Sequence, residues 1–172
     1  MIDQLINEKI SSIQTPLLNK LMILITNIGN KYTILILSIL IFSFLIYKKD
    51  YIKAKFLTIV IIGGMILTQL LKLIFQRARP RFSLIEVTGH SFPSGHATIS
   101  IIFFISLIYI FKNKIKNQEK RYIFISINIL LFLLIGFSRI YLNAHWLTDV
   151  LAGFLVGIIW FIFIKHIYSK TL

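Results

Sequence analysis

The stretch PSGHATISIIFFISLIYIF, residues 93–111, decides the class of fold. It begins with a short turn sequence, Pro93 to His96, and continues as an apolar run over residues 97–111. A run of this kind is typical of a helix that spans a membrane, where an ionisable side chain is costly and by default marks a functional site. His96, at the start of the run, is therefore the first candidate functional residue.

Composition places the whole chain in the same class. The 172 residues are 57% hydrophobic with a mean hydropathy of +0.84, which is more apolar surface than a soluble core of this size can bury. A span needs about 20 residues, so the ends of several runs must extend into flanking residues. We expect an all-α, polytopic membrane helical bundle with five transmembrane helices, over residues 32–47, 54–74, 97–111, 122–137 and 150–164.

The first thirty residues differ from the rest of the chain. Residues 1–16 place apolar side chains at helical spacing among charged ones, which predicts an amphipathic helix at the membrane interface that ends at Pro16. The next run, residues 17–28, is shorter than a span, so we interpret it as half-inserted or interfacial, with a sixth full span as the alternative. Residues 1–30 are thus expected to form an N-terminal interfacial or short membrane segment of one domain over residues 1–172.

Basic residues are biased to one side of the predicted bundle. Nineteen Lys and Arg against six Asp and Glu give a net charge of +13, but they cluster between apolar runs and form no basic face with interleaved aromatics, which argues against nucleic acid as a partner. Cationic loops stay in the cytoplasm, so we expect a multi-pass protein of the bacterial inner membrane with a cytoplasmic C-terminus. The expected cytoplasmic side holds Lys48, Lys49, Lys53, Lys55, Lys112, Lys114, Lys116, Lys120, Arg121, Lys165 and Lys170.

Three polar clusters lie at the ends of apolar runs on the other predicted side of the membrane. Because each cluster adjoins the end of a run, we expect the fold to gather all three into one polar pocket at one membrane face. The clusters are Lys72 with Arg79-Pro80, then Pro93-Ser94-Gly95-His96, then Ser138-Arg139 with His145 and Asp149.

The first two clusters suit a phosphate group, which needs cations and backbone N–H groups aimed at its oxygens. Lys72 and Arg79 supply positive charge, and the planar fork of Arg79 can bind two oxygens. Pro80 ends one helix and Pro93 is suited to begin the next, whose first N–H groups would point at the anion. Those N–H groups belong to Ser94, Gly95 and His96.

The third cluster supplies a nucleophile. His145 and Asp149 are four residues apart, so on a helix they share a face, and the carboxylate can accept the proton of one imidazole nitrogen. The other nitrogen is then free to attack, Arg139 adds a third cation, and His96 is left to protonate the departing oxygen. A metal site that also uses His90 is the chemical rival, but a cationic pocket repels a divalent ion, so we expect neither metal nor cofactor.

Together the three motifs resemble the signature motifs of the type 2 phosphatidate phosphatase superfamily, which includes bacterial lipid phosphate phosphatases and the vanadium haloperoxidases. The resemblance covers roughly residues 72–149. It implies a metal-independent phosphatase in which His145 forms a phosphohistidine, Asp149 orients it and His96 acts as general acid. It implies that phosphate is bound by Lys72, Arg79, Ser94, Gly95 and Arg139, with Pro80, Pro93 and Ser138 in supporting positions.

The expected function is hydrolysis of a lipid phosphate or diphosphate at the extracytoplasmic face. Undecaprenyl diphosphate is the first candidate substrate, followed by phosphatidylglycerophosphate and phosphatidate. Two alternatives stay open: a lipid phosphotransferase that passes the phosphate to another lipid, and a non-catalytic lipid-phosphate-binding or transport protein. Arg77 and Arg81 have two equal interpretations, as partners of lipid headgroups or as solvated loop residues.

Overall fold

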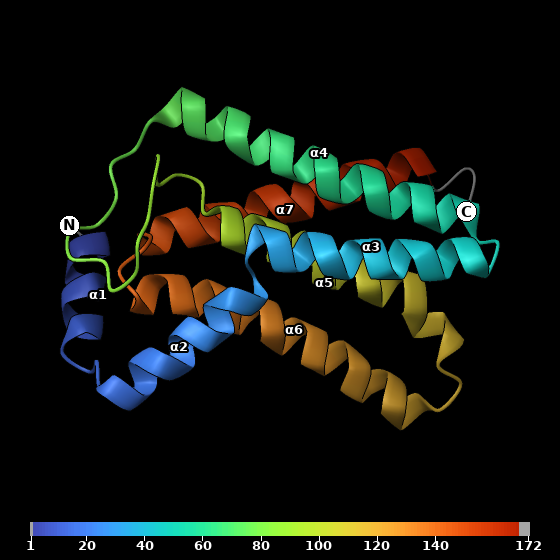
Figure 1. Ribbon diagram of the computed structural model, residues 1–172, viewed down its shortest axis with the longest axis horizontal. Helices are drawn as coiled ribbons and strands as arrows, with labels where there is room; N and C mark the ends of the chain where they lie inside the picture. Colours follow the sequence, from blue (N-terminus) through green and yellow to red (C-terminus); the bar gives the residue numbers. More distant parts are fainter. Residues whose placement is uncertain (1, 169–172) are drawn as a thin grey trace.

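The chain folds into an all-helical bundle in the computed structural model, which describes residues 2–168 (Figure 1). This confirms the predicted all-α membrane fold, and the described residues contain no strand. In chain order the elements are α1 (Ile2–Ser11), α2 (Pro16–Ile28), α3 (Lys31–Tyr47), α4 (Tyr51–Phe75), α5 (Gly95–Phe111), the 3-10 turn η1 (Lys112–Lys114), α6 (Gln118–Tyr141) and α7 (Leu147–Tyr168).

Four segments are long and apolar enough to cross a membrane on their own, namely Tyr51–Phe75, Gly95–Lys114, Gln118–Tyr141 and Leu147–Tyr168. A fifth candidate is the pair α2 and α3, which meet at a bend of 45°. The short run at residues 17–28 and the run at residues 32–47 are therefore two arms of one bent unit. Capping explains the break, because the Asn30 side chain accepts a hydrogen bond from the Tyr32 N–H and so starts a new helix.

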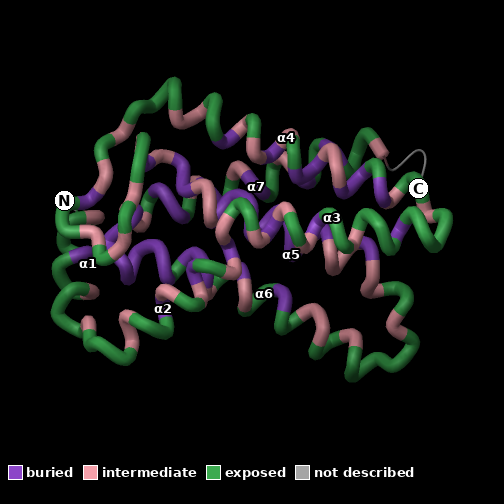
Figure 2. Tube along the Cα trace, in the orientation of Figure 1, coloured by how far each residue is buried: buried purple, intermediate pink, exposed green. Residues whose placement is uncertain are grey.

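Helix α5 forms the centre of the bundle. Ten of its seventeen residues are buried, and it packs against α4, α6 and α7. Figure 2 shows the buried positions on the inward faces and exposed positions along the outer faces of the surrounding helices. The exposed side chains of α4 include Leu70, Leu73 and Ile74, as expected for a helix whose outer face meets lipid.

The contact between α5 and α7 depends on two glycines of α7. A Cβ at Gly153 would lie 2.8 Å from the Ser94 carbonyl oxygen, and one at Gly157 would lie 2.4 Å from Ile101 Cγ2. Small residues of this kind let two membrane helices approach closely. The close approach brings the start of α7 against the start of α5.

We expect Gly153→Ala to lower the unfolding free energy by about 1–3 kcal/mol, because the new methyl group meets backbone that cannot move aside. The readout is the thermal unfolding midpoint of the purified protein in detergent. Leu151→Ala, at an exposed position of the same helix, is the matched control and should change stability by less than about 0.5 kcal/mol. Equal midpoints for Gly153→Ala and the wild type would contradict the packing argument.

One end of the bundle gathers the three predicted clusters. The end of α4, the start of α5, the end of α6 and the start of α7 meet there, and α1 lies across them (Figure 1). The α3–α4 turn, η1 and the end of α7 lie at the opposite end, which also carries the basic loops at residues 48–55 and 112–121. Lys170, also expected on that side, is outside the described residues.

Candidate active site

His145 and Asp149 lie at the α6–α7 corner. The corner loop is held by the Ala144 and His145 N–H groups, which donate to the Arg139 carbonyl oxygen at 3.0 and 3.2 Å. His145 is 2% exposed and Asp149 is fully buried. His145 Nδ1 lies 3.5 Å from Asp149 Oδ2, and the same carboxylate oxygen accepts hydrogen bonds from the Ser91 hydroxyl and the Trp146 N–H. The two residues are therefore in contact, but His145 lies in the turn before α7 and not on a shared helix face as predicted.

The contact with Arg79 indicates which ring nitrogen of His145 is unprotonated. Arg79 Nη1 lies 3.2 Å from His145 Nε2. A guanidinium can only donate, so Nε2 must be the acceptor and the imidazole proton sits on Nδ1, facing Asp149. The unprotonated nitrogen thus points toward a cation.

Arg79 itself is clamped by the loop between α4 and α5. It donates to the carbonyl oxygens of Thr88 and Gly89, both at 2.9 Å, and of Ala144 at 2.7 Å. Gly89 allows this loop its shape because its φ is +68°. Burial lowers the pKa of Arg79 from its usual value, and the nearby Asp149 charge raises it. The guanidinium remains charged at neutral pH.

The start of α5 carries Ser94, Gly95 and His96, and one of their three N–H groups differs from the prediction. Ser94 caps the helix, and its hydroxyl accepts the Ala97 N–H at 3.5 Å. The Ser94 N–H, however, donates to the Asp149 carbonyl oxygen at 3.0 Å, because the starts of α5 and α7 are in contact. The Ser94 N–H is therefore already hydrogen-bonded and is not directed at an anion. The N–H groups of Gly95 and His96 begin α5, where no preceding helical turn can accept from them.

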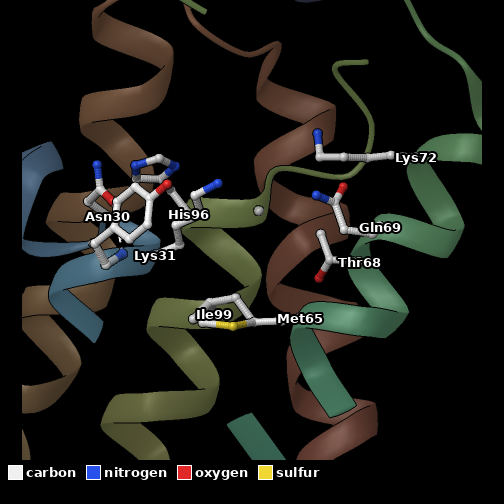
Figure 3. A pocket seen from close by; sticks show the side chains of 11 residues that line it. Asn30, Lys31, Met65, Thr68, Gln69, Lys72, His96 and Ile99 are labelled. Atoms are coloured by element: carbon white, nitrogen blue, oxygen red, sulfur yellow. Dashed lines mark hydrogen bonds between the residues drawn. The ribbon is translucent and has the colours of Figure 1, made fainter. Parts of the chain in front are cut away.

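A cavity of about 250 Å³ adjoins this helix start. Figure 3 shows His96 with Asn30 and Lys31 on one side and Lys72 on the other, above an apolar floor. Lys72 Nζ donates to the His90 carbonyl oxygen at 2.5 Å, which holds it near the turn. A polar rim over an apolar floor suits a lipid whose polar group is bound at the rim. The remaining lining residues are Gly29, Tyr32, Met65, Thr68, Gln69, Gly95 and Ile99.

The other predicted residues lie around this centre. Arg139 is 4% exposed and donates from Nη1 to the Thr26 hydroxyl of α2 at 2.7 Å. Ser138 is buried and its hydroxyl donates back to the Ile135 carbonyl oxygen at 2.7 Å, which makes it a packing residue. Pro80 and Pro93 are buried, and Pro93 follows a cis peptide bond.

Burial lowers the pKa of His145 to about 4. The hydrogen bond to Asp149 opposes this by raising the pKa, while the charges of Arg139, Arg79 and Lys72 lower it further. His145 is consequently neutral at neutral pH, with Nε2 as its unprotonated nitrogen.

Sequence reasoning missed several residues of the site. Ser91 and Trp146 both donate to Asp149, and Arg77 contacts Asp149 as well as Asp3 of α1, which excludes a purely solvated role for Arg77. Only the nearness of Ser91 and Trp146 to the motifs could have suggested them.

Among residues 2–168, no three His, Cys, Asp or Glu side chains lie close enough to hold a metal, so the rival set with His90 is not brought together.

Fold and site define an integral, multi-pass membrane protein with a buried His–Asp pair among cations, as expected for phosphate-ester chemistry. The family model of the PAP2 superfamily matches residues 53–172, and the chain belongs to that superfamily. The predicted fold class and the predicted resemblance to this superfamily are therefore confirmed.

Similar proteins and solved structures support the same family. The chain is 28% identical to phosphatidylglycerophosphatase B of Bacillus subtilis, over 98% of this chain and 84% of the relative. It is 32% identical to lipid A 4'-phosphatase of Porphyromonas gingivalis, over 94% and 72%. A crystal structure of a transmembrane PAP2-type phosphatidylglycerolphosphate phosphatase from Bacillus subtilis superposes with a TM-score of 0.86 at 28% identity, covering 98% of this chain and 85% of that one. The Aquifex aeolicus LpxE structure gives 0.74 at 28% identity, covering 96% and 93%.

Proposed function

We propose that this membrane phosphatase hydrolyses the phosphate monoester or diphosphate of a lipid through a phosphohistidine at His145, without a metal. The observation that carries the proposal is the orientation of His145, whose Nδ1 faces Asp149 while its Nε2 faces Arg79. A nucleophile needs a lone pair directed at the phosphorus position and a partner that stabilises the charge it gains. Asp149 supplies the second condition, and the first is met when a bound phosphate replaces Arg79 as the partner of Nε2.

In the first step His145 Nε2 forms a bond to phosphorus as the bond from phosphorus to the lipid oxygen breaks. Protonated His96 donates its proton to that oxygen, so the lipid leaves as an alcohol, or as a monophosphate if the substrate is a diphosphate. In the second step His96 takes a proton from water as the water oxygen attacks phosphorus. The N–P bond breaks, inorganic phosphate departs, and both histidines return to their starting states.

The cations stabilise the charge that spreads over the phosphoryl oxygens in both steps. We assign this role to Lys72, Arg79 and Arg139, together with the N–H groups of Gly95 and His96. The Ser94 hydroxyl is the group through which Ser94 would bind phosphate, since its N–H is committed to Asp149.

Substrates are proposed from the names of the relatives. One relative, matched over 98% of this chain, is a phosphatidylglycerophosphatase. Another, from Sulfolobus acidocaldarius, is an undecaprenyl-diphosphatase, with 27% identity over 84% of this chain and 68% of the relative. Phosphatidylglycerophosphate and undecaprenyl diphosphate are therefore the leading candidates, with phosphatidate third.

The site is proposed to face outside the cytoplasm, within one membrane domain that comprises the whole chain. Support comes from the basic loops at residues 48–55 and 112–121, which lie at the end of the bundle opposite the site. Loops rich in Lys and Arg remain in the cytoplasm. We infer from this arrangement that, in a bacterium, the protein lies in the inner membrane with its C-terminus in the cytoplasm.

The test is phosphate release by purified, detergent-solubilised protein in excess EDTA, on each of the three lipids. We expect release to persist in EDTA, and the relative rates to rank the substrates. Loss of activity in EDTA that added metal restores would overturn the metal-free mechanism. Transfer of phosphate to an added acceptor lipid would identify a phosphotransferase, and binding without turnover would identify a binding protein.

The rate of the reaction should depend on pH in a bell-shaped way. His145 must be neutral to attack, and its pKa is lowered from 6.5 to about 4, so activity is retained above that pH and lost as the pH falls through it. The basic limb is expected in kcat, where the negative charge of the bound phosphate favours the protonated form of His96. We expect the acid limb of kcat/KM close to pH 4, and an acid limb at or above 6.5 would contradict the buried, neutral His145.

A further inference from the structure

Helix α1 is joined to the active site by an ionic bridge that the proposed reaction does not use. Arg77 Nη1 lies 2.6 Å from Asp149 Oδ1, and Arg77 Nη2 lies 2.7 Å from Asp3 Oδ2. One guanidinium therefore connects the amino-terminal helix to the carboxylate that faces His145. A planar guanidinium can bind two carboxylates at once in fixed directions, which an ammonium group cannot do.

Asp3 also caps the helix that carries Asp149. Its Oδ1 accepts the Thr148 N–H at 3.1 Å and its Oδ2 accepts the Thr148 hydroxyl at 2.6 Å. The first N–H groups of a helix have no partner within it and favour an anion, so a carboxylate from α1 supplies the cap that α7 needs. Burial raises the pKa of Asp3, but hydrogen bonds from Thr148 and Arg77 hold it below its usual value, so the cap is ionised at neutral pH.

Arg77 is itself held in one orientation. Its Nη1 donates to the Thr148 hydroxyl at 2.7 Å as well as to Asp149, and its guanidinium lies 5.7 Å from the centre of the Trp146 ring. Asp149 Oδ2 is occupied by Ser91 and Trp146, which leaves Oδ1 for Arg77. A fully buried carboxylate with both oxygens occupied has little freedom to rotate away from His145.

The remainder of the amino-terminal segment is fastened to the same corner. Asn143 Nδ2 donates to the Ser11 hydroxyl at 3.1 Å, and Gln14 Nε2 donates to the Tyr141 carbonyl oxygen at 2.7 Å. In Figure 1, α1 lies across the end of the bundle where the loop into α5 and the start of α7 meet. The position of Asp3 is thus set by contacts with α6 and with the α6–α7 corner.

We propose that Asp3 and Arg77 are positioning residues that fix Asp149, and through it His145, so that α1 is part of the catalytic unit and not only a helix at the membrane surface. The inference rests on the proposed function, because it assigns these residues to the His145 reaction. Neither residue touches the phosphate in this account. Their loss should therefore slow the chemical step without weakening phosphate binding.

The test compares Arg77→Gln and Asp3→Asn in the full chain, with phosphatidylglycerophosphate as substrate. We expect kcat to fall by about 10–100-fold for Arg77→Gln and by less for Asp3→Asn, the range typical when a residue that orients a reactive side chain is lost. KM and the inhibition constant of inorganic phosphate, the product, should stay within about twofold of the wild type. Arg77→Lys should recover part of kcat, because it keeps one charge beside Asp149.

The matched controls are Arg81→Gln in the same loop and Glu8→Gln in the same helix, which should leave kcat unchanged. The double variant Asp3→Asn/Arg77→Gln should be no slower than Arg77→Gln alone, because the two residues act through one bridge. Unfolding midpoints of all variants are measured in parallel. If Arg77→Gln does not fold, the kcat of Asp3→Asn, the milder change, decides the test.

Three outcomes would overturn the inference: an unchanged kcat in both single variants, additive losses in the double variant, or a shift of KM and of inhibition by inorganic phosphate together with kcat. In the last case Arg77 would bind substrate directly. A wild-type protein that releases no phosphate from any lipid would contradict the proposed function itself. An active wild type with unaffected variants would contradict only the role of the bridge.

Discussion

His145→Ala should reduce phosphate release by roughly 10⁴-fold or more, the scale seen when a nucleophile that acts with partners is removed. The substitution leaves Arg79, Lys72 and Arg139 in place, so the cationic pocket persists without an atom to attack phosphorus. We expect vanadate or phosphate still to bind while turnover stops. The measurement is initial-rate phosphate release at saturating lipid.

The control for this variant is His166→Ala, at the opposite end of α7, which should retain the wild-type rate. Unfolding midpoints establish that both variants are folded. Residual activity of His145→Ala within about tenfold of the wild type would refute its role as nucleophile. An equal loss in His166→Ala would point to damage to the bundle as the cause.

Arg79→Gln should have the second-largest effect, a loss of about 10³-fold in kcat/KM, at the lower end of the range for an arginine that stabilises a phosphoryl-transfer transition state. Arg79 contacts both the α4–α5 loop and His145 Nε2, so its removal takes away charge and also loosens the Thr88–His90 turn. Kinetics on phosphatidylglycerophosphate and vanadate inhibition report the loss. Both KM and kcat should change, in contrast to Arg77→Gln.

Arg79→Lys separates the two contributions. A lysine keeps the charge but cannot reach several carbonyl oxygens and a phosphate with one planar group, so we expect less than full recovery. Arg81→Gln is the matched control because Arg81 is exposed and two residues away. Wild-type activity in Arg79→Gln would show that the contact with His145 has no part in catalysis.

Hydropathy and motif spacing were sufficient to predict the helical membrane class and the meeting of three clusters at one end. Each cluster adjoins the end of an apolar run, and successive spans run in opposite directions, so Lys72, His96 and His145 had to reach the same face. The bend between α2 and α3 could not be predicted in this way. The cap at Asn30 starts the new helix, but the close approach at Gly29, where a Cβ would lie 2.4 Å from Ile135 Cγ2, has no local sequence signal.

The ion pair between Asp3 and Arg77 could not be predicted from the sequence either. The two residues are 74 positions apart, and the amphipathic pattern around Asp3 predicts a helix at the membrane surface. The committed N–H of Ser94 is a similar case, since its acceptor belongs to Asp149 on another helix. Spacing predicts which side chains share a face, whereas pairings between distant elements require the packed structure.

The central claim, a covalent phosphohistidine at His145, is tested most directly by trapping it. Protein mixed with phosphate-labelled phosphatidylglycerophosphate is quenched within the first turnover in alkali, and the labelled residue is mapped by mass spectrometry. We predict an alkali-stable, acid-labile phosphate on His145 in the wild type and none in His145→Ala. Release of phosphate with no labelled protein at any time, or a label on another residue, would contradict the account.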